Sequence, residues 1–349
     1  MLRALTARRI ATAAAYGGGG LTAVGGLTYG LIKLEAFLAR KIILGTPNGD
    51  PPVADGPYGA ALPGMPLSFV VLGDSTAAGL GVHTAGETPA ALLAAGLSSI
   101  AGRPVLLTNV ARSGSQSGAL AGQVTRALEA GPDVAVIMIG ANDVTNRVPA
   151  AESVRHLGSA VERLRAAGCE VVVGTCPDLG SVEPLMQPLR WFAQRASRQL
   201  AAAQTIAAVE RGARSVSLGD LLGREFAADP REMFSADRYH PSARGYAAAA
   251  AAVLPSMAAA LELEPELDAL PDPGLGTGVL PVYLAAAEAA EEPGTEVVGA
   301  RLAGRERGPR GRWARLLRRR RVGEPAGPDG PGGPGEPGGG PAAVAPGAA

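Results

Sequence analysis

The sequence has few cysteines, few lysines and few histidines, and each shortage narrows the kinds of site that it can build. Its 349 residues include two cysteines and three histidines. Neither the C-x2-C spacing nor the H-E-x-x-H motif of common zinc sites occurs, so we expect no metal site. Lys33 and Lys41 are the only lysines, and nearly all positive charge is therefore arginine.

The two cysteines, Cys169 and Cys176, bracket an apolar segment that we expect to be a strand. Seven residues of extended chain span roughly 23 Å, at about 3.3 Å for each residue. A disulfide needs Cα atoms within about 7 Å of each other. The sequence therefore predicts two free thiols.

The composition divides the chain into four parts. The total of 47% hydrophobic residues suits a globular core, whereas the 49 glycines and 29 prolines gather near the ends. We expect residues 45–66 to be a Pro/Gly linker and residues 67–261 to be the one compact domain. Residues 262–349 are first acidic, then arginine-rich, then Pro/Gly-rich. We expect this tail to be largely disordered, apart from short helices near residues 282–291 and 312–321.

The first part, residues 1–44, holds an uncharged segment at residues 10–32 with basic residues on both sides. Its length suits a membrane span. Glycines dilute the Leu, Ile and Val that drive insertion, and a clear small-x-small cleavage site is missing. We favour an uncleaved single-pass anchor of unspecified orientation, so that the protein is membrane-associated. A cleaved signal sequence and a soluble or surface-lying segment are the alternatives, with a secreted or cytoplasmic location.

Within residues 67–261, apolar segments of strand length alternate with helical patterns. We expect strands at residues 67–73, 105–110, 133–139, 170–175 and 215–218, and helices at 88–101, 120–130, 154–164, 189–211 and 243–261. Such alternation calls for parallel strands with helices on both faces. The prediction is a flavodoxin-like three-layer α/β/α domain with a five-stranded parallel sheet, flanked by non-globular tails.

The first predicted strand ends on Gly73-Asp74-Ser75. In an open α/β sheet, ligands bind beyond the carboxyl ends of the strands, so Ser75 is well placed to be a nucleophile. Most serines at such positions only cap a helix. The assignment therefore depends on what else reaches the same edge.

A serine nucleophile needs a base, which is usually a histidine oriented by a carboxylate. His156 lies off the apolar stripe of its predicted helix and has the features of a surface residue. His83 follows Ser75 in a Gly-rich loop without an obvious carboxylate. His240 has Asp237 three positions ahead, so we favour His240, although Asp237 could also only cap the next helix.

Acyl transfer also needs hydrogen-bond donors for the developing oxyanion. The backbone N–H groups of Ser75 and Gly114 and the side-chain amide of Asn142 are the candidates. Each has an ordinary alternative as a turn or cap residue.

Together these residues form four short blocks in a fixed order: Gly73-Asp74-Ser75 with Gly79, Asn109 with Gly114, Gly140-x-Asn142-Asp143, and Asp237-x-x-His240-Pro241. In this the chain resembles the SGNH (GDSL-type) hydrolase family, over residues 67–261 and neither tail. No G-x-S-x-G elbow occurs, which disfavours the ordinary α/β-hydrolases.

The resemblance implies a role for each site residue. Ser75 would be the nucleophile, His240 the general base and Asp237 the orienting acid. Ser75, Gly114 and Asn142 would supply the oxyanion donors. The implied activity is ester hydrolysis through an acyl-enzyme on Ser75, without a cofactor.

The family includes lysophospholipases, lipases, thioesterases and carbohydrate acetylesterases, so the substrate stays open. Residues 179–192 are apolar and could line the cleft, although packing as helix core is the alternative. With the predicted anchor, this favours a lipid-like acyl ester over a carbohydrate or small-ester deacetylase. As a function of another class, the arginine-rich tail could dock on a membrane surface. Trp313 is the only aromatic residue in that stretch, and we expect no nucleic acid partner.

Overall fold

The computed structural model describes most of the chain between residues 27 and 318. The described residues are 27–43, 45, 49–218, 226, 228–263, 279–291, 295–302, 305–306 and 313–318. Most of the predicted anchor, residues 1–26, lies outside them, as does the end of the predicted tail, residues 319–349.

Five parallel strands form the centre of the sheet, and each lies where the sequence predicts a strand. In sheet order they are β3 (Val105–Asn109), β2 (Leu67–Gly73), β4 (Val134–Met138), β5 (Glu170–Gly174) and β6 (Arg214–Val216). Residues Phe69 to Leu72 of β2 have no exposed surface. A run of apolar residues suits a strand that is covered on both faces.

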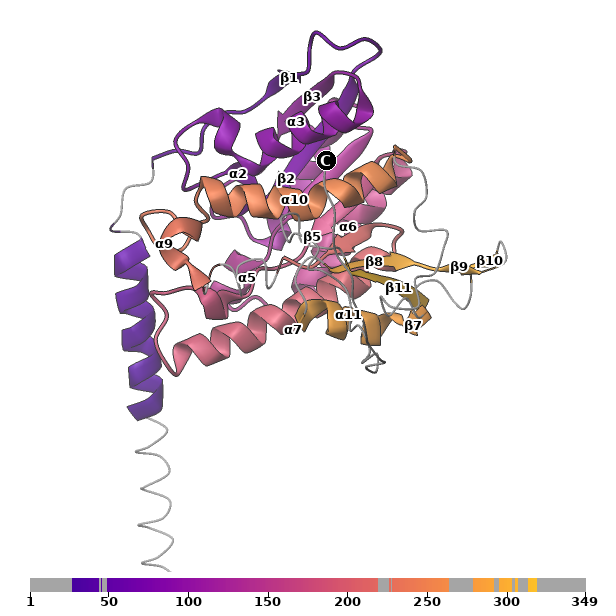
Figure 1. The fold of residues 1–349 in the computed structure, drawn as a ribbon. Helices are drawn as coiled ribbons and strands as arrows, with labels where there is room; N and C mark the ends of the chain where they lie inside the picture. The colour runs from indigo at the N-terminus through magenta and orange to yellow at the C-terminus, as the bar shows by residue number, and fades with distance from the viewer. Residues whose placement is uncertain are drawn as a thin grey trace, which may run out of the picture. The chain divides into compact units, whose positions relative to one another are not determined.

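Helices cover both faces of the sheet, which makes three layers (Figure 1). They are α3 (Pro89–Ala101), α4 (Leu120–Glu129), α6 (Ala150–Ala166), α7 (Leu189–Val209) and α10 (Ala243–Ala260). Successive side chains of a strand point to opposite faces. Accordingly, Phe69 and Val71 of β2 pack with residues of α3 and α10, whereas Val70 and Leu72 pack with residues of α4 and α6.

The prediction of a five-stranded parallel sheet was incomplete, because the sheet in the described residues is mixed and has nine strands. At one edge, β1 (Gly56–Tyr58) pairs antiparallel with β3. At the other edge, three antiparallel strands continue beyond β6. In sheet order they are β8 (Thr295–Gly299), β11 (Trp313–Arg318) and β7 (Val279–Pro281). Two further strands, β9 (Arg301–Leu302) and β10 (Arg305–Glu306), pair with each other.

The described residues between 279 and 318 therefore differ from the tail that we expected to be largely disordered. The predicted helix at residues 282–291 is confirmed as α11 (Val282–Glu291). The predicted helix at residues 312–321 is wrong, because residues 313–318 form β11. Ala314 and Leu316 are buried on one face of this strand and pack with α11. Burial with a period of two outweighs the helix propensity of the Arg and Leu residues.

The shorter elements lie mostly around the carboxyl edge of the sheet. They are α2 (Ser75–Ala78), η1 (Ala85–Glu87), η2 (Ser117–Ala119), α5 (Ala141–Thr145), η3 (Leu179–Ser181) and α9 (Pro230–Met233). A further helix covers residues 27–43 and is named the N-terminal helix below. In the part of the chain that the structure describes, no helix combines the length and apolarity needed to cross a bilayer.

Both cysteines are buried and free, as the strand between them predicted. β5 occupies residues 170–174 and keeps Cys169 and Cys176 at its two ends.

Candidate active site

The turn after β2 places Ser75 at the carboxyl edge of the sheet. Gly73 has a φ of 143°, and a Cβ atom there would lie 1.9 Å from the carbonyl oxygen of Met138. Only glycine therefore fits where β2 and β4 approach each other. Asp74 caps α2 by accepting a 3.0 Å hydrogen bond from the N–H of Thr76. As a result, Ser75 begins a helix and is 6% exposed.

The structure brings Ser75, His240 and Asp237 together, although Ser75 and His240 are 165 positions apart. The Nε2 atom of His240 lies 3.0 Å from the Oγ atom of Ser75. Its Nδ1 atom lies 2.6 Å from Oδ2 of Asp237. An imidazole between a hydroxyl and a carboxylate is the arrangement that activates a serine.

Asp237 is held as a carboxylate by several donors. Its Oδ1 atom accepts hydrogen bonds from the hydroxyl of Ser235 at 2.8 Å and from the N–H groups of Tyr239 and His240 at 2.9 Å. Burial alone would raise the pKa of Asp237, but the hydrogen bonds and charge of His240 and the Tyr239 N–H lower that pKa below its ordinary value. Asp237 therefore stays charged and can orient the imidazole.

Asp74 links the turn that carries Ser75 to the segment after β4. Its Oδ2 atom accepts a 3.3 Å hydrogen bond from the N–H of Gly140, which precedes α5. Burial raises the pKa of Asp74 to about 6, partly offset by the N–H groups of Thr76 and Gly140 and by the charge of His240. Because α5 carries Asn142, Asp74 places that amide relative to Ser75.

The other predicted oxyanion donors, Gly114 and Asn142, lie on segments that are hydrogen-bonded to the turn after β2. Gly114 has a φ of 79°, which favours glycine, and it lies in the loop after β3. The N–H of Arg112 in this loop donates to the carbonyl oxygen of Gly73 at 3.2 Å. Asn142 lies in the first turn of α5.

Two buried side chains that hold these segments were not identified from the sequence as positioning residues. Asp143 accepts the N–H of Ser117 at 3.1 Å through each oxygen and also accepts the hydroxyl of Ser153. It thereby ties the loop of Gly114 to the helix of Asn142. Gln123 accepts the N–H of Gly73 at 2.8 Å and donates to its carbonyl oxygen at 2.9 Å. The sequence signal for Gln123 is that it is a polar residue on the apolar stripe of a helix. Asp143 is part of the block Gly140-x-Asn142-Asp143, which the sequence analysis noted.

The two other histidines lie elsewhere. His83 is exposed, and its backbone N–H donates to Glu87. His156 lies on α6 at 3.9 Å from Glu152. Of the three histidines, His240 is the one within hydrogen-bond distance of Ser75.

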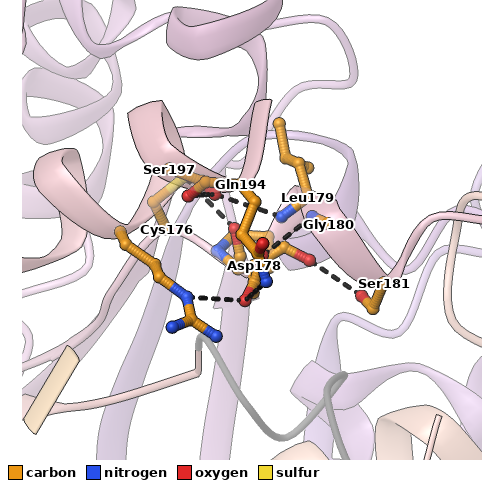
Figure 2. Close-up of polar contacts among 9 residues, drawn as sticks. Cys176, Asp178, Leu179, Gly180, Ser181, Gln194 and Ser197 are labelled. Atoms are coloured by element: carbon orange, nitrogen blue, oxygen red, sulfur yellow. Dashed lines mark hydrogen bonds and ion pairs between the residues drawn. The ribbon is translucent and has the colours of Figure 1, made fainter. Parts of the chain in front are cut away.

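One carboxylate holds the loop after β5 (Figure 2). Asp178 is 3% exposed and accepts hydrogen bonds from the N–H of Gly180 at 2.8 Å, from Gln194 at 3.3 Å and from Arg198 at 2.9 Å. Gln194 and Arg198 belong to α7, so this carboxylate fixes the loop on that helix. The hydroxyl of Ser197 adds a bond by accepting the N–H of Leu179 at 3.2 Å.

This geometry agrees with the comparison against known families. The model of the GDSL-like lipase/acylhydrolase family matches residues 71–248, just over half of the chain. The chain belongs to this family. The resemblance to SGNH (GDSL-type) hydrolases is thereby confirmed, and the protein is an ester-hydrolysing enzyme.

Individual members of the GDSL-like family and solved structures are similar to the chain over different lengths. The Mycobacterium tuberculosis protein named GDSL-like esterase Rv1075c is 43% identical over 233 residues, covering 63% of this chain and 73% of that protein. The crystal structure of TesA is 25% identical with a TM-score of 0.42, covering 56% of this chain and 99% of TesA. Axe2, an acetylxylan esterase from Geobacillus stearothermophilus, is 18% identical with a TM-score of 0.43, covering 61% of this chain and 98% of Axe2. Both TM-scores lie below 0.5, so neither likeness carries an argument about substrate.

Proposed function

We propose that Ser75, His240 and Asp237 are the catalytic triad of this esterase and that its preferred substrates are lipid-like acyl esters. The observation that carries the triad is the pair of hydrogen bonds that His240 makes, at 3.0 Å to Ser75 and at 2.6 Å to Asp237.

In the proposed reaction, Nε2 of His240 takes the proton of Ser75 while Oγ attacks the ester carbonyl carbon. Asp237 stabilises the imidazolium that forms. The carbonyl oxygen becomes an oxyanion, which accepts hydrogen bonds from the N–H groups of Ser75 and Gly114 and from the amide of Asn142. His240 then gives its proton to the leaving alcohol, and an acyl-enzyme remains.

Water completes the cycle. His240 removes a proton from a water molecule, whose oxygen attacks the acyl carbon. When the second tetrahedral intermediate collapses, the bond to Oγ of Ser75 breaks and Oγ regains a proton from His240. The products are a carboxylic acid and free enzyme, and every step uses residues of this chain.

An apolar cluster beside His240 supports the lipid-like substrate. Tyr239 lies with its ring edge-on to the ring of His240, at 4.8 Å between centroids. It packs on a cluster formed by Ala141, Leu179 and Val182, with Val144 and Leu185 partly buried against them. Ala141 precedes the proposed oxyanion donor, so this cluster lies beside both the base and the donor. Its partly buried members Val144, Leu185 and Tyr239 are the ones that an acyl chain could contact. Each buried CH₂ of an acyl chain would add about 0.8 kcal/mol, or roughly fourfold in binding.

A carbohydrate or small-ester deacetylase is the second candidate. The 6% exposure of Ser75 favours it, because a nearly buried nucleophile admits a small acyl group most easily. Acyl-chain length therefore separates the two substrate classes.

The test is a series of p-nitrophenyl esters from acetate to laurate, measured as kcat/KM. For a lipid-like substrate, we expect kcat/KM to rise from acetate to medium chains, and Leu185→Ser should reduce the value for medium chains more than for acetate. Leu106→Ser, at an exposed leucine of β3, is the matched control and should change neither. A strict preference for acetate in the wild type would favour the deacetylase.

Ser75→Ala tests the assignment of the triad separately from the substrate class. We expect it to lower kcat by about 10⁴-fold or more while the circular dichroism spectrum and thermal unfolding stay unchanged. Full activity in a folded Ser75→Ala protein would remove the triad assignment, whatever the chain-length profile.

A further inference from the structure

The N-terminal helix has an inward face that packs on the domain. Glu35 and Ala39 are buried, with Ile32 and Ala36 half-buried at helical spacing beside them. The carboxylate of Glu35 accepts a 3.0 Å hydrogen bond from the N–H of Leu189. Leu189 is the first residue of α7, whose first N–H groups have no partner within the helix. Glu35 therefore caps α7 and holds the N-terminal helix there. The ribbon of this helix lies beside the start of α7 (Figure 1).

The outward face of the same helix is also apolar. Four leucines follow one another at spacings of four, three and four residues, and a phenylalanine lies beside them. Their exposed fractions are 75% for Leu27, 46% for Leu31, 53% for Leu34, 41% for Leu38 and 64% for Phe37. A helix on the surface of a soluble domain normally turns polar residues outward. Contiguous exposed apolar residues of this kind mark an interaction site.

Two further exposed apolar side chains lie near the start of α7. Trp191 and Phe192 follow the capped residue Leu189 and are 50% and 46% exposed. Their rings pack edge to face with centroids 4.9 Å apart. Tryptophan is enriched where one side of a residue meets lipid and the other meets water.

The exposed charges of the N-terminal helix have one sign. Lys33, Arg40 and Lys41 are exposed on the N-terminal helix, and both lysines of the chain are among them. The one acidic residue of that helix, Glu35, is turned inward onto α7. An apolar face with cations at its border complements an anionic lipid surface, where the long basic side chains reach the headgroups.

We propose that the outward face of the N-terminal helix, with Trp191 and Phe192, is a docking surface for an anionic lipid bilayer. The helix lies in the interface and does not cross it. A second copy of the chain fits the surface less well, because the leucine stripe spans fewer than two heptads and stable coiled coils need about three or more. The proposal does not depend on the proposed substrate, since it concerns binding and not hydrolysis.

The test is flotation of the full chain with vesicles of phosphatidylcholine, alone or mixed with phosphatidylglycerol. We expect binding to the mixed vesicles that weakens as salt is raised. The double variant L31D/L34D should reduce this binding by about tenfold or more, because two leucines lose burial in lipid. Leu106→Asp is the matched control, since Leu106 is exposed to the same 46% as Leu31 but lies on β3. It should bind as the wild type does.

Tryptophan fluorescence reports which part of the chain touches the lipid. The chain has two tryptophans, so Trp313→Phe leaves Trp191 as the sole emitter. We expect mixed vesicles to shift its emission to the blue, and L31D/L34D in the same background to remove the shift. Flotation without a shift, or equal flotation of L31D/L34D and wild type, would mean that another segment binds and would overturn the proposal.

Light scattering without lipid tests the alternative that a second copy of the chain binds this surface. A wild-type dimer that L31D/L34D converts to a monomer would assign the face to a second copy and overturn the proposal. Hydrolysis of a water-soluble short ester by L31D/L34D should equal that of the wild type, so failure of docking is distinguishable from failure of the esterase assignment.

Discussion

Two buried aspartates near Ser75 have pKa values shifted in opposite directions. Asp237 accepts a hydrogen bond from the ring of His240 and three more from nearby donors, which outweigh its burial. Asp74 accepts two backbone N–H groups, with Asp143 also close by, and there burial dominates. The charged form of an aspartate side chain is therefore stabilised at Asp237 and destabilised by burial at Asp74.

This difference predicts a pH-dependent stability that belongs to Asp74. Burial raises its pKa from the ordinary 3.8 to about 6. The folded state therefore holds a proton that the unfolded state has lost between these values, and stability falls as pH rises through this window. The loss of stability caused by Asp74 is absent at pH values below its ordinary pKa. It is complete at pH values above the pKa of Asp74 in the folded state. A shift of this size corresponds to about 3 kcal/mol at most.

Urea unfolding of the wild type and Asp74→Asn at several pH values checks the prediction. The free energy of unfolding of the wild type minus that of the variant should decrease by about 2–3 kcal/mol from pH 4 to pH 7. Asp237 contributes the opposite sign, since its lowered pKa gives stability that is lost as pH falls, but it is present in both proteins and cancels. A difference that is constant with pH would contradict the prediction.

At the scale of elements, loops at the carboxyl edge are held by single buried side chains. Asp143 joins the loop after β3 to α5, and Asp178 joins the loop after β5 to α7 (Figure 2). The second loop contributes Leu179 and Val182 to the apolar cluster beside Tyr239. A change at Asp178 should therefore alter the proposed acyl-binding cluster while leaving Ser75 in place.

We expect Asp178→Asn to lower the free energy of unfolding by about 1–3 kcal/mol, because a charge-assisted hydrogen bond with Arg198 is lost. The KM for medium-chain esters should rise more than the KM for acetate, since the loop moves while the triad stays in place. Glu183→Gln is the control, because Glu183 is an exposed carboxylate in the same loop. Equal KM changes for all chain lengths in Asp178→Asn would argue against this loop as part of the proposed acyl-binding cluster.

At the scale of the molecule, the sheet is extended by strands that follow the predicted domain. β8 pairs with β6, and Arg214 of β6 lies 2.7 Å from the fully buried carboxylate of Glu296 on β8. The same guanidinium donates to the carbonyl oxygen of Ala259 at the end of α10 at 3.3 Å. One arginine thus joins the centre of the sheet, its extension and a covering helix.

Arg214→Ala should lower the free energy of unfolding by about 2–4 kcal/mol, because it withdraws a cation from a buried carboxylate. Arg244→Ala is the matched control. Arg244 lies 4.0 Å from Glu232, and both side chains are more than 60% exposed, so we expect a change below about 0.5 kcal/mol. Equal midpoints for the two variants in chemical unfolding would show that the extension adds little stability.

The sequence by itself determined the elements and the chemistry that depend on local patterns. Apolar runs located the five central strands, and four short blocks identified the family and selected Ser75, Asp237 and His240. These signals are local, since each depends on a residue and its near neighbours in the chain.

The tertiary structure alone decided what depends on burial between distant segments. It placed His240 against Ser75, turned Asp143 and Gln123 into supports of the site, and made residues 313–318 a strand where local propensity favours a helix. The extra strands beyond β6 also follow from pairing partners that no local pattern specifies. Hydrogen bonds and burial between residues far apart in the chain become defined only when the fold is complete, and the geometry of the site depends on them.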